Sequence, residues 1–152
     1  MIRVAIDRDL DAVSAIEQLS PTAAHWTEAQ YKLAIVQPER LFLVAEEEGT
    51  ILGFLIAFTG ALEWELESLA VLASGRKRGI GRGLMETLIG AAQHAEATEI
   101  RQEIRASNHA AQALGQKMRF VQEGTRTHYY RNPDEDALLF KYLIKNKQNK
   151  GK

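Results

Sequence analysis

The N-terminal part of the chain shows the pattern of a strand followed by a helix. Ile2, Val4 and Ile6 alternate with Arg3 and Ala5, which predicts a half-buried strand. The Asp at position 7 can cap a helix that follows directly. The apolar residues of this helix recur at helical spacing and are Leu10, Val13, Ile16 and Leu19.

A second helix is predicted to begin at Thr27, where two start signals coincide. Thr27 and Gln30 have the spacing of a capping box, and Trp26 and Tyr31 occupy the two positions of a hydrophobic staple. Pro38 ends the helix. Packing at the staple is the simplest interpretation of Trp26 and Tyr31, and the alternative is that both line a groove for a peptide substrate.

The remaining pattern predicts three strands, a helix, a strand, a helix and a closing hairpin. The first two of these strands are joined by a tight turn at Glu48-Gly49. The expected ranges are 41–45, 51–58, 65–71, 80–95, 100–105, 108–118, 120–130 and 137–144. The order βααβββαβαββ indicates an α/β (α+β) fold with a mixed central sheet and helices on both of its faces.

Composition indicates one soluble domain. The chain has 152 residues, 45% of them hydrophobic, no cysteine and a net charge of −1, which excludes disulfides and thiolate sites and disfavours DNA binding. The uncharged stretch 51–62 is shorter than the about 20 residues of a membrane span. We expect a cytoplasmic protein with no membrane contact, a domain over 1–144 and a disordered basic tail over 145–152.

The segment 76–83 carries the clearest chemical signal, because it holds three glycines and four basic residues between a predicted strand and a predicted helix. Free amides at a helix start and the helix dipole favour an anion there, and Gly79 and Gly81 let a diphosphate approach. The Walker pattern is absent, and Leu84 stands where a dinucleotide fingerprint needs glycine. An ordinary glycine-softened helix start is the alternative.

Arg76-Lys-Arg-Gly79-Ile-Gly81 after Leu69-Ala-Val71 resembles the pyrophosphate loop of the GNAT superfamily of acetyl-CoA-dependent N-acetyltransferases. The likeness spans nearly the whole chain. The block 103–108 (Glu-Ile-Arg-Ala-Ser-Asn) with Tyr129-Tyr130 and Glu135-Asp-Ala137 looks most like the RimI type, which acetylates the N-terminal alanine of a ribosomal protein. This resemblance implies a mostly antiparallel sheet.

The resemblance also implies how acetyl-CoA, the cosubstrate, is held. The backbone of Leu69 and Val71 would pair with the pantetheine arm, as an added strand would, and Asn108 would bond the same arm. The residues implied for the pyrophosphate are Arg76, Lys77, Arg78, Gly79, Ile80, Gly81 and Arg82. No metal is implied, and the spacing of the histidines predicts no metal site.

Glu103 is implied as the general base that takes a proton from an α-ammonium through water, and Glu65 is its rival. Without the resemblance, Glu103 could be a solvent-facing strand residue. The family's general acid, a tyrosine, is replaced by Gly115. A water, Tyr129 or Tyr130 could take its place. In a regular strand these two tyrosines point to opposite faces, so one is expected in the core and the other at the acceptor site.

These features together predict direct acetyl transfer, with both substrates bound, to a protein N-terminal amine such as the alanine of a ribosomal protein. Two alternatives stay open: an acetyltransferase for a small amine or a lysine side chain, and a CoA-binding module that Gly115 has impaired. A nucleic-acid-binding module fits the charge poorly. A monomer or weak homodimer is expected.

Overall fold

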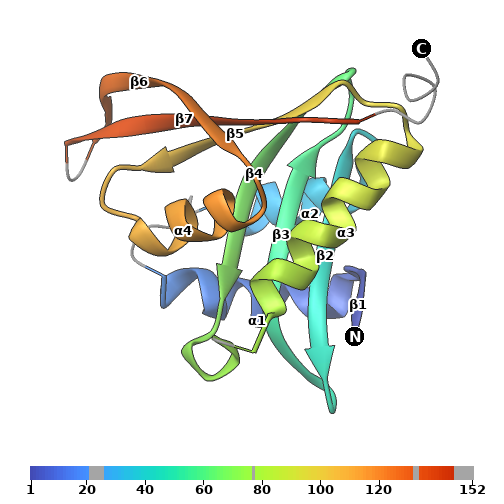
Figure 1. Cartoon of the computed structure of the whole chain (residues 1–152). Helices are drawn as coiled ribbons and strands as arrows, with labels where there is room; N and C mark the ends of the chain where they lie inside the picture. The colour runs from blue at the N-terminus through green and yellow to red at the C-terminus, as the bar shows by residue number, and fades with distance from the viewer. Residues whose placement is uncertain (21–25, 77, 132–133, 146–152) are drawn as a thin grey trace.

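A computed structural model describes residues 1–20, 26–76, 78–131 and 134–145. A seven-stranded sheet in the order β1-β2-β3-β4-β5-β7-β6 forms its centre (Figure 1). Every neighbouring pair is antiparallel except β4 and β5. The predicted fold class, a mixed and mostly antiparallel sheet, is therefore confirmed.

The order of elements also agrees with the prediction. The strands are β1 (Ile2–Val4), β2 (Arg40–Glu47), β3 (Thr50–Phe58), β4 (Glu63–Val71), β5 (Glu99–Arg105), β6 (Val121–Tyr130) and β7 (Glu135–Leu143). The α-helices are α1 (Leu10–Gln18), α2 (Glu28–Val36), α3 (Ile80–His94) and α4 (His109–Lys117). The tip of the predicted hairpin at 132–133 and the predicted tail, apart from Lys145, lie outside the described residues.

Two details of the N-terminal prediction are wrong. Val4 and Ile6 are exposed, whereas Ala5 is buried. Asp7 does not cap α1, since residues 7–9 form a separate 3-10 turn in which the Asp9 carboxylate accepts the Ile6 N–H at 2.8 Å. Arg3 binds the same carboxylate at 2.8 and 2.9 Å, so the short strand and the turn are fixed by a charged contact that spacing does not reveal.

The start of α2 follows its sequence signals. The Thr27 hydroxyl accepts the Gln30 N–H at 3.2 Å, and the Gln30 side chain accepts the Thr27 N–H at 2.7 Å, which completes the capping box. The Trp26 and Tyr31 rings lie 5.6 Å apart at the staple positions. Tyr31 is 1% exposed and packs between Phe42 and Phe54, so it is a core residue.

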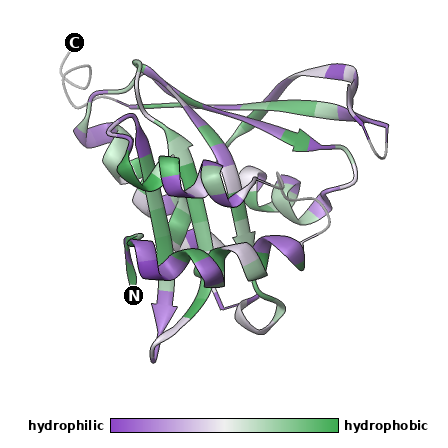
Figure 2. Cartoon of the chain, turned by 180° about the vertical axis from the view of Figure 1, so that it is seen from behind, coloured by the Kyte–Doolittle hydropathy of each residue, from purple (hydrophilic) through white to green (hydrophobic). Residues whose placement is uncertain are grey.

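Helices cover both faces of the sheet, as expected. The helix α3 packs with buried residues of β2 to β5 in one hydrophobic cluster, and α1 and α2 pack with the opposite side chains of β2 and β3 in a second cluster. Figure 2 shows the central strands as largely hydrophobic, and polar residues lie on the outer sides of the helices in front of them. The sheet therefore separates two cores, and functional groups must lie at its edges or where its strands part.

The strands part between β4 and β5. Their parallel pairing runs from Glu63↔Glu99 to Leu66↔Gln102 and stops there. Beyond this point β4 continues along β3, whereas β5 continues along β7, and the two strands diverge (Figure 1). Among the described residues, the divergence leaves the β5 side of residues 67–71 of β4 without a neighbouring strand. The gap between β4 and β5 lies in the middle of the sheet.

Candidate active site

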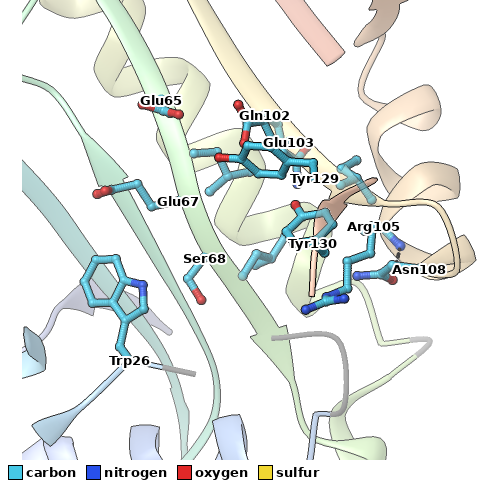
Figure 3. A pocket seen from close by; sticks show the side chains of 14 residues that line it. Trp26, Glu65, Glu67, Ser68, Gln102, Glu103, Arg105, Asn108, Tyr129 and Tyr130 are labelled. Carbon is cyan, nitrogen blue, oxygen red and sulfur yellow. Dashed lines mark hydrogen bonds between the residues drawn. The ribbon is translucent and has the colours of Figure 1, made fainter. Parts of the chain in front are cut away.

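A pocket of about 340 Å³ lies where β4 and β5 diverge. It is bordered by side chains from β4, β5, the start of α4 and the end of β6, with Trp26 at its far side (Figure 3). Of the predicted acceptor and catalytic residues, the pocket brings together Glu65, Glu103, Trp26, Tyr129 and Tyr130. Tyr31 does not line it, which corrects the prediction that Tyr31 contacts a substrate.

Glu103 on β5 contacts two neighbouring side chains in this pocket, Arg126 and Tyr129. One of its oxygens lies 3.6 Å from the Arg126 guanidinium. Hydrogen bonding of the Tyr129 hydroxyl to Glu103, with the charge of that carboxylate, raises the pKa of Tyr129. Glu103 is a partly buried strand residue with 25% side-chain exposure, so it does not simply face solvent.

Glu65 on β4 also borders the pocket and lies in an acidic environment. Burial raises the pKa of its carboxyl, and the neighbouring charges of Glu103 and Glu67 raise it further. Among the described residues Glu65 makes no hydrogen bond or ion pair. Two carboxylates with different surroundings thus face one pocket, as acid–base chemistry requires.

The wall around Trp26 depends on a residue that the sequence did not single out. Arg40 binds both oxygens of Glu67, at 2.8 and 3.0 Å. Its guanidinium also lies 5.5 Å from the Trp26 ring centre and 5.8 Å from that of Phe58. Glu17, which is buried, accepts the Trp26 N–H. Trp26 is therefore held by two groups from other parts of the chain, Arg40 over its ring and Glu17 at its backbone N–H.

The two adjacent tyrosines lie on the same pocket, which corrects the expectation that they point to opposite faces. Their rings are 5.1 Å apart and almost perpendicular. The pairing of β6 with β7 is irregular between Arg126 and Tyr130, and His128 has a φ of 53°. Because the strand is not regular there, the alternation rule fails and both rings turn inward (Figure 3).

Asn108 begins α4 and also borders the pocket. Its side-chain oxygen accepts the Ala111 N–H at 3.1 Å, which caps the helix. The amide nitrogen of the same side chain is left to donate toward a ligand. Capping thus fixes the orientation of the Asn108 side chain at the border of the pocket.

The open edge of β4 carries the backbone groups predicted for the pantetheine arm. Leu69 and Val71 pair with Leu55 and Gly53 of β3 on one side only. Their strand has no partner on the β5 side among the described residues. An extended ligand could therefore add to this edge as a peptide strand does.

The glycine loop lies at the end of this edge and leads into the 15-residue helix α3. Gly79 has a φ of 78°, and a Cβ added there would meet nothing within 4 Å, so the space beside the first-turn amides is open. Ile80 opens the helix and packs its side chain on the core. Lys77 lies outside the described residues.

The arginines of the loop are exposed and weakly anchored. Arg78 contacts Glu47, Arg82 contacts Glu86 at 3.0 Å, and Arg76 donates to the Val71 carbonyl at 3.4 Å. Exposed ion pairs of this kind contribute little to stability, so a phosphate can displace them at small cost. The free amides at the start of α3, the left-handed Gly79 and the exposed arginines of the loop together fit the pyrophosphate of CoA.

Two buried polar atoms that sequence reasoning missed also face the pocket. Ser68 and Gln102 are 7% and 8% exposed, and within the described residues neither Ser68 Oγ nor Gln102 Oε1 has a hydrogen-bond partner. Such atoms are costly when left unpaired. Ser68 occupies a position that alternates with Trp64, Leu66 and Ala70 in the sequence, and a serine in this otherwise apolar series was the available signal.

Gly115 lies within α4, is buried, and has an ordinary helical conformation. A Cβ at this position would contact Phe120 and Phe140 at 3.7 and 3.8 Å, which is ordinary packing. Neither backbone strain nor crowding therefore requires glycine. The replacement of the family tyrosine removes a hydroxyl without an evident structural benefit.

The described residues also show whether the chain can hold a metal ion or cross a membrane as a helix. Among the described residues no group of three or more His, Asp or Glu side chains is arranged to hold a metal ion. No helix in the described part of the chain combines the length and apolar character needed to cross a membrane.

Comparison with known proteins agrees with this geometry. The family model "Acetyltransferase (GNAT) family" matches residues 10–120. The chain is 34% identical over 134 residues to the [ribosomal protein bS18]-alanine N-acetyltransferase of Escherichia coli, covering 86% of this chain and 88% of that protein. It is 28% identical over 131 residues to a putative enzyme of the same name from Bacillus subtilis, covering 86% and 87%.

Solved structures show the same fold. The crystal structure of the ribosomal-protein-S18-alanine N-acetyltransferase from Escherichia coli superposes with a TM-score of 0.83 at 29% identity, covering 95% of this chain and 93% of that one. Ard1 from Thermoplasma volcanium gives a TM-score of 0.87 at 25% identity, covering 96% and 98%. With its glycine loop and divided sheet, the chain belongs to the GNAT family and is an acetyl-CoA-dependent N-acetyltransferase.

Proposed function

We propose that this enzyme acetylates the α-amine of a protein N-terminus, with the N-terminal alanine of a ribosomal protein as its acceptor. The observation that carries the proposal is the position of Glu103, a partly buried carboxylate in a pocket walled by aromatic rings beside the open edge of β4. The named relatives act on ribosomal protein bS18, which supports the same class of acceptor here.

The cosubstrate would lie along β4 and reach the glycine loop. The N–H and C=O groups of Leu69 and Val71 would pair with the pantetheine arm, and Asn108 would donate its amide to it. The group proposed for the pyrophosphate is Arg76, Lys77, Arg78, Gly79, Ile80, Gly81 and Arg82. Bound there, acetyl-CoA supplies an activated acetyl group at the point where β4 and β5 part.

Glu103 would act as the general base. An α-ammonium has an ordinary pKa of about 7.7–8.0, so a carboxylate near neutral pH can take its proton directly or through one water. The free amine then attacks the acetyl carbon while both substrates are bound; an N–C bond forms and the C–S bond breaks. Glu65 is the alternative base, since its environment favours proton uptake.

The departing thiolate needs a proton that Gly115 cannot give. Tyr129 is engaged with Glu103. We assign the replacement to the Tyr130 hydroxyl or to a water, because no hydrogen bond to Glu103 engages Tyr130. General acid help is worth about 10²–10⁴ in rate, and positioning of two reactants contributes more, so the enzyme would be slower without it but active.

The test is release of CoA with an alanine-starting peptide that carries the N-terminal sequence of the organism's ribosomal protein bS18. We expect turnover only when the α-amine is free, and at least a tenfold loss in E103Q. The matched control is E123Q, because Glu123 is an exposed glutamate on β6 that does not border the pocket. E65Q, measured alongside, separates the two candidate bases.

Other outcomes identify other functions. Faster turnover of polyamines or of peptides with a blocked α-amine and a free lysine would replace the N-terminal acceptor with a small amine or a lysine side chain. Binding of acetyl-CoA without turnover of any acceptor would indicate an impaired CoA-binding module. Equal activity of E103Q and E123Q would show that Glu103 is not the base.

A further inference from the structure

We propose that Arg105 is a positioning residue that fixes the Tyr130 ring over the acceptor pocket, and that Glu135 and Ser107 hold Arg105 in place. The inference rests on the proposed function, in which the pocket that Tyr130 lines receives the acceptor and the Tyr130 hydroxyl is a candidate for the general acid. It also gives a role to three residues of the sequence motif that the proposed reaction leaves without one.

The contact between Arg105 and Tyr130 is close. The guanidinium carbon lies 4.2 Å from the ring centre, a short distance for a stacked cation and aromatic ring. Burial raises the pKa of Tyr130 to about 12, so the ring keeps its proton over the working range of pH. Figure 3 shows the arginine side chain beside the ring on the wall of the pocket nearest Asn108.

Arg105 is itself anchored by a carboxylate that is bound at both oxygens. Glu135 Oε1 accepts from the Arg105 guanidinium at 3.2 Å and from the Ser107 hydroxyl at 2.9 Å, and Glu135 Oε2 accepts the Ser107 N–H at 2.9 Å. The Ser107 hydrogen bond and the nearby guanidinium lower the pKa of Glu135, which keeps it ionised. A planar guanidinium suits this double task better than an ammonium.

The need for such an anchor follows from the strand itself. The β6–β7 pairing gives no register partner for residues 127–129, so the sheet fixes the backbone of Tyr130 only through its pair with Glu135. Within the described residues no hydrogen bond holds the Tyr130 hydroxyl. The ring orientation is thus set by the two groups that contact the ring, Arg105 over its face and the perpendicular Tyr129 ring beside it.

A neighbouring pair provides the contrast. Arg126 lies 5.5 Å from the Tyr129 ring centre and is itself exposed, at 56% of its side chain, whereas the Arg105 and Glu135 side chains are each 14% exposed. Arg101 on the same strand is 50% exposed, pairs with Glu63 and Glu99, and does not line the pocket. Arg101 is therefore a control for removing an arginine from β5 without removing a contact to Tyr130.

The test is a double-mutant cycle between Arg105 and Tyr130, measured with an alanine-starting peptide. We expect R105Q to reduce kcat/KM for the peptide about tenfold through KM, with the KM for acetyl-CoA changed less than twofold. R105K should recover little of the lost kcat/KM, because lysine keeps the charge but lacks the planar group that stacks on the ring. R101Q should have the kcat/KM of the unmodified enzyme. In a Y130L background, R105Q should change kcat/KM less than twofold.

A second readout does not depend on turnover. Side-chain protons of Arg105 stacked on the ring should show upfield NMR shifts that disappear in Y130L and diminish in E135Q. Additive losses in the cycle, or Arg105 shifts unchanged in Y130L, would overturn the inference. If no alanine-starting peptide is acetylated but these shifts are present, the proposed function fails while the positioning of Tyr130 by Arg105 stands.

Discussion

The two sides of the divide between β4 and β5 are built in different ways. The cofactor side consists of backbone edges, a left-handed glycine and exposed arginines with loose partners. On the acceptor side the aromatic side chains are held by other side chains, as Trp26 is by Arg40 and Tyr130 by Arg105. One side is determined by main-chain geometry and the other by long-range packing.

This difference follows from what each side must recognise. A pyrophosphate presents the same charge and shape in every reaction cycle, and free amides with a helix dipole suffice to bind it. An acceptor must be distinguished from other amines, which requires rigid groups in fixed positions. Variants on the two sides should therefore affect different kinetic constants, and the following predictions test that separation.

The largest effect is expected from L88A, which removes a fully buried side chain beneath α3, the helix that carries the glycine loop. A cavity of this kind costs about 2–5 kcal/mol of unfolding free energy. Thermal unfolding should show a lower Tm, while Kd for acetyl-CoA at low temperature stays within twofold. The control Q93A, on the exposed side of α3, should leave Tm unchanged. A lost affinity for acetyl-CoA in folded L88A would contradict a pyrophosphate site that is confined to the glycine loop.

The next effect is expected from G79A on the cofactor side. A left-handed conformation costs a residue with a Cβ about 1–2 kcal/mol, and the site has no crowding that would add to it. Calorimetry should show weaker binding of acetyl-CoA, and the KM for the peptide should be unchanged. G90A in the same helix should stabilise the protein by about 0.5–1 kcal/mol, since Gly90 has ordinary helical geometry and free space.

A smaller effect is expected from R40M on the acceptor side. The variant removes contacts to the Trp26 and Phe58 rings that are worth about 0.5–1 kcal/mol each, and it leaves Glu67 unpaired. Peptide KM should rise severalfold while Kd for acetyl-CoA stays constant. R40K tests whether charge alone suffices. A change in acetyl-CoA affinity without a change in peptide KM would reverse the assignment of this wall.

The smallest effect concerns His128, at the irregular part of β6. Its ring lies 2.8 Å from Asp134, and this hydrogen bond and the charge of Asp134 raise its pKa above the ordinary 6.5. The contact between His128 and Asp134 therefore stabilises the folded protein below pH 6.5, and this stabilisation is lost as pH rises through the raised pKa of His128. NMR titration should show a pKa above 6.5 that returns toward this value in D134N. An unchanged pKa in D134N would exclude this contact in solution.

Local signals in the sequence predicted much of the molecule. The capping box of Thr27 and Gln30, the Glu48-Gly49 turn and the order of strands and helices all lie where the patterns placed them. These features depend on residues a few positions apart. The glycine loop is of the same kind, because Gly79 stands directly before the predicted helix in the sequence, and the left-handed conformation found there is one that glycine adopts readily.

The errors arose where distant residues compete with a local rule. Tyr31 was a candidate for the acceptor groove, but Phe42 and Phe54 enclose it in the core, and only its staple contact with Trp26 is confirmed. Tyr129 and Tyr130 should alternate, but the irregular pairing of β6 with β7 turns both inward. Asp7 is well placed for a cap, but Arg3 draws Asp9 into that region instead.

The sequence by itself determined the fold class, the glycine loop and the presence of a carboxylate in the Glu-Ile-Arg-Ala-Ser-Asn block, because backbone conformation and amphipathic periodicity are local properties. Only the tertiary structure decided which side chains enclose the acceptor: Arg40 on Trp26, Arg105 on Tyr130, and a buried Ser68 without a partner among the described residues. Stacking and burial depend on segments that meet only when β4 and β5 diverge, and no spacing along the chain encodes that meeting.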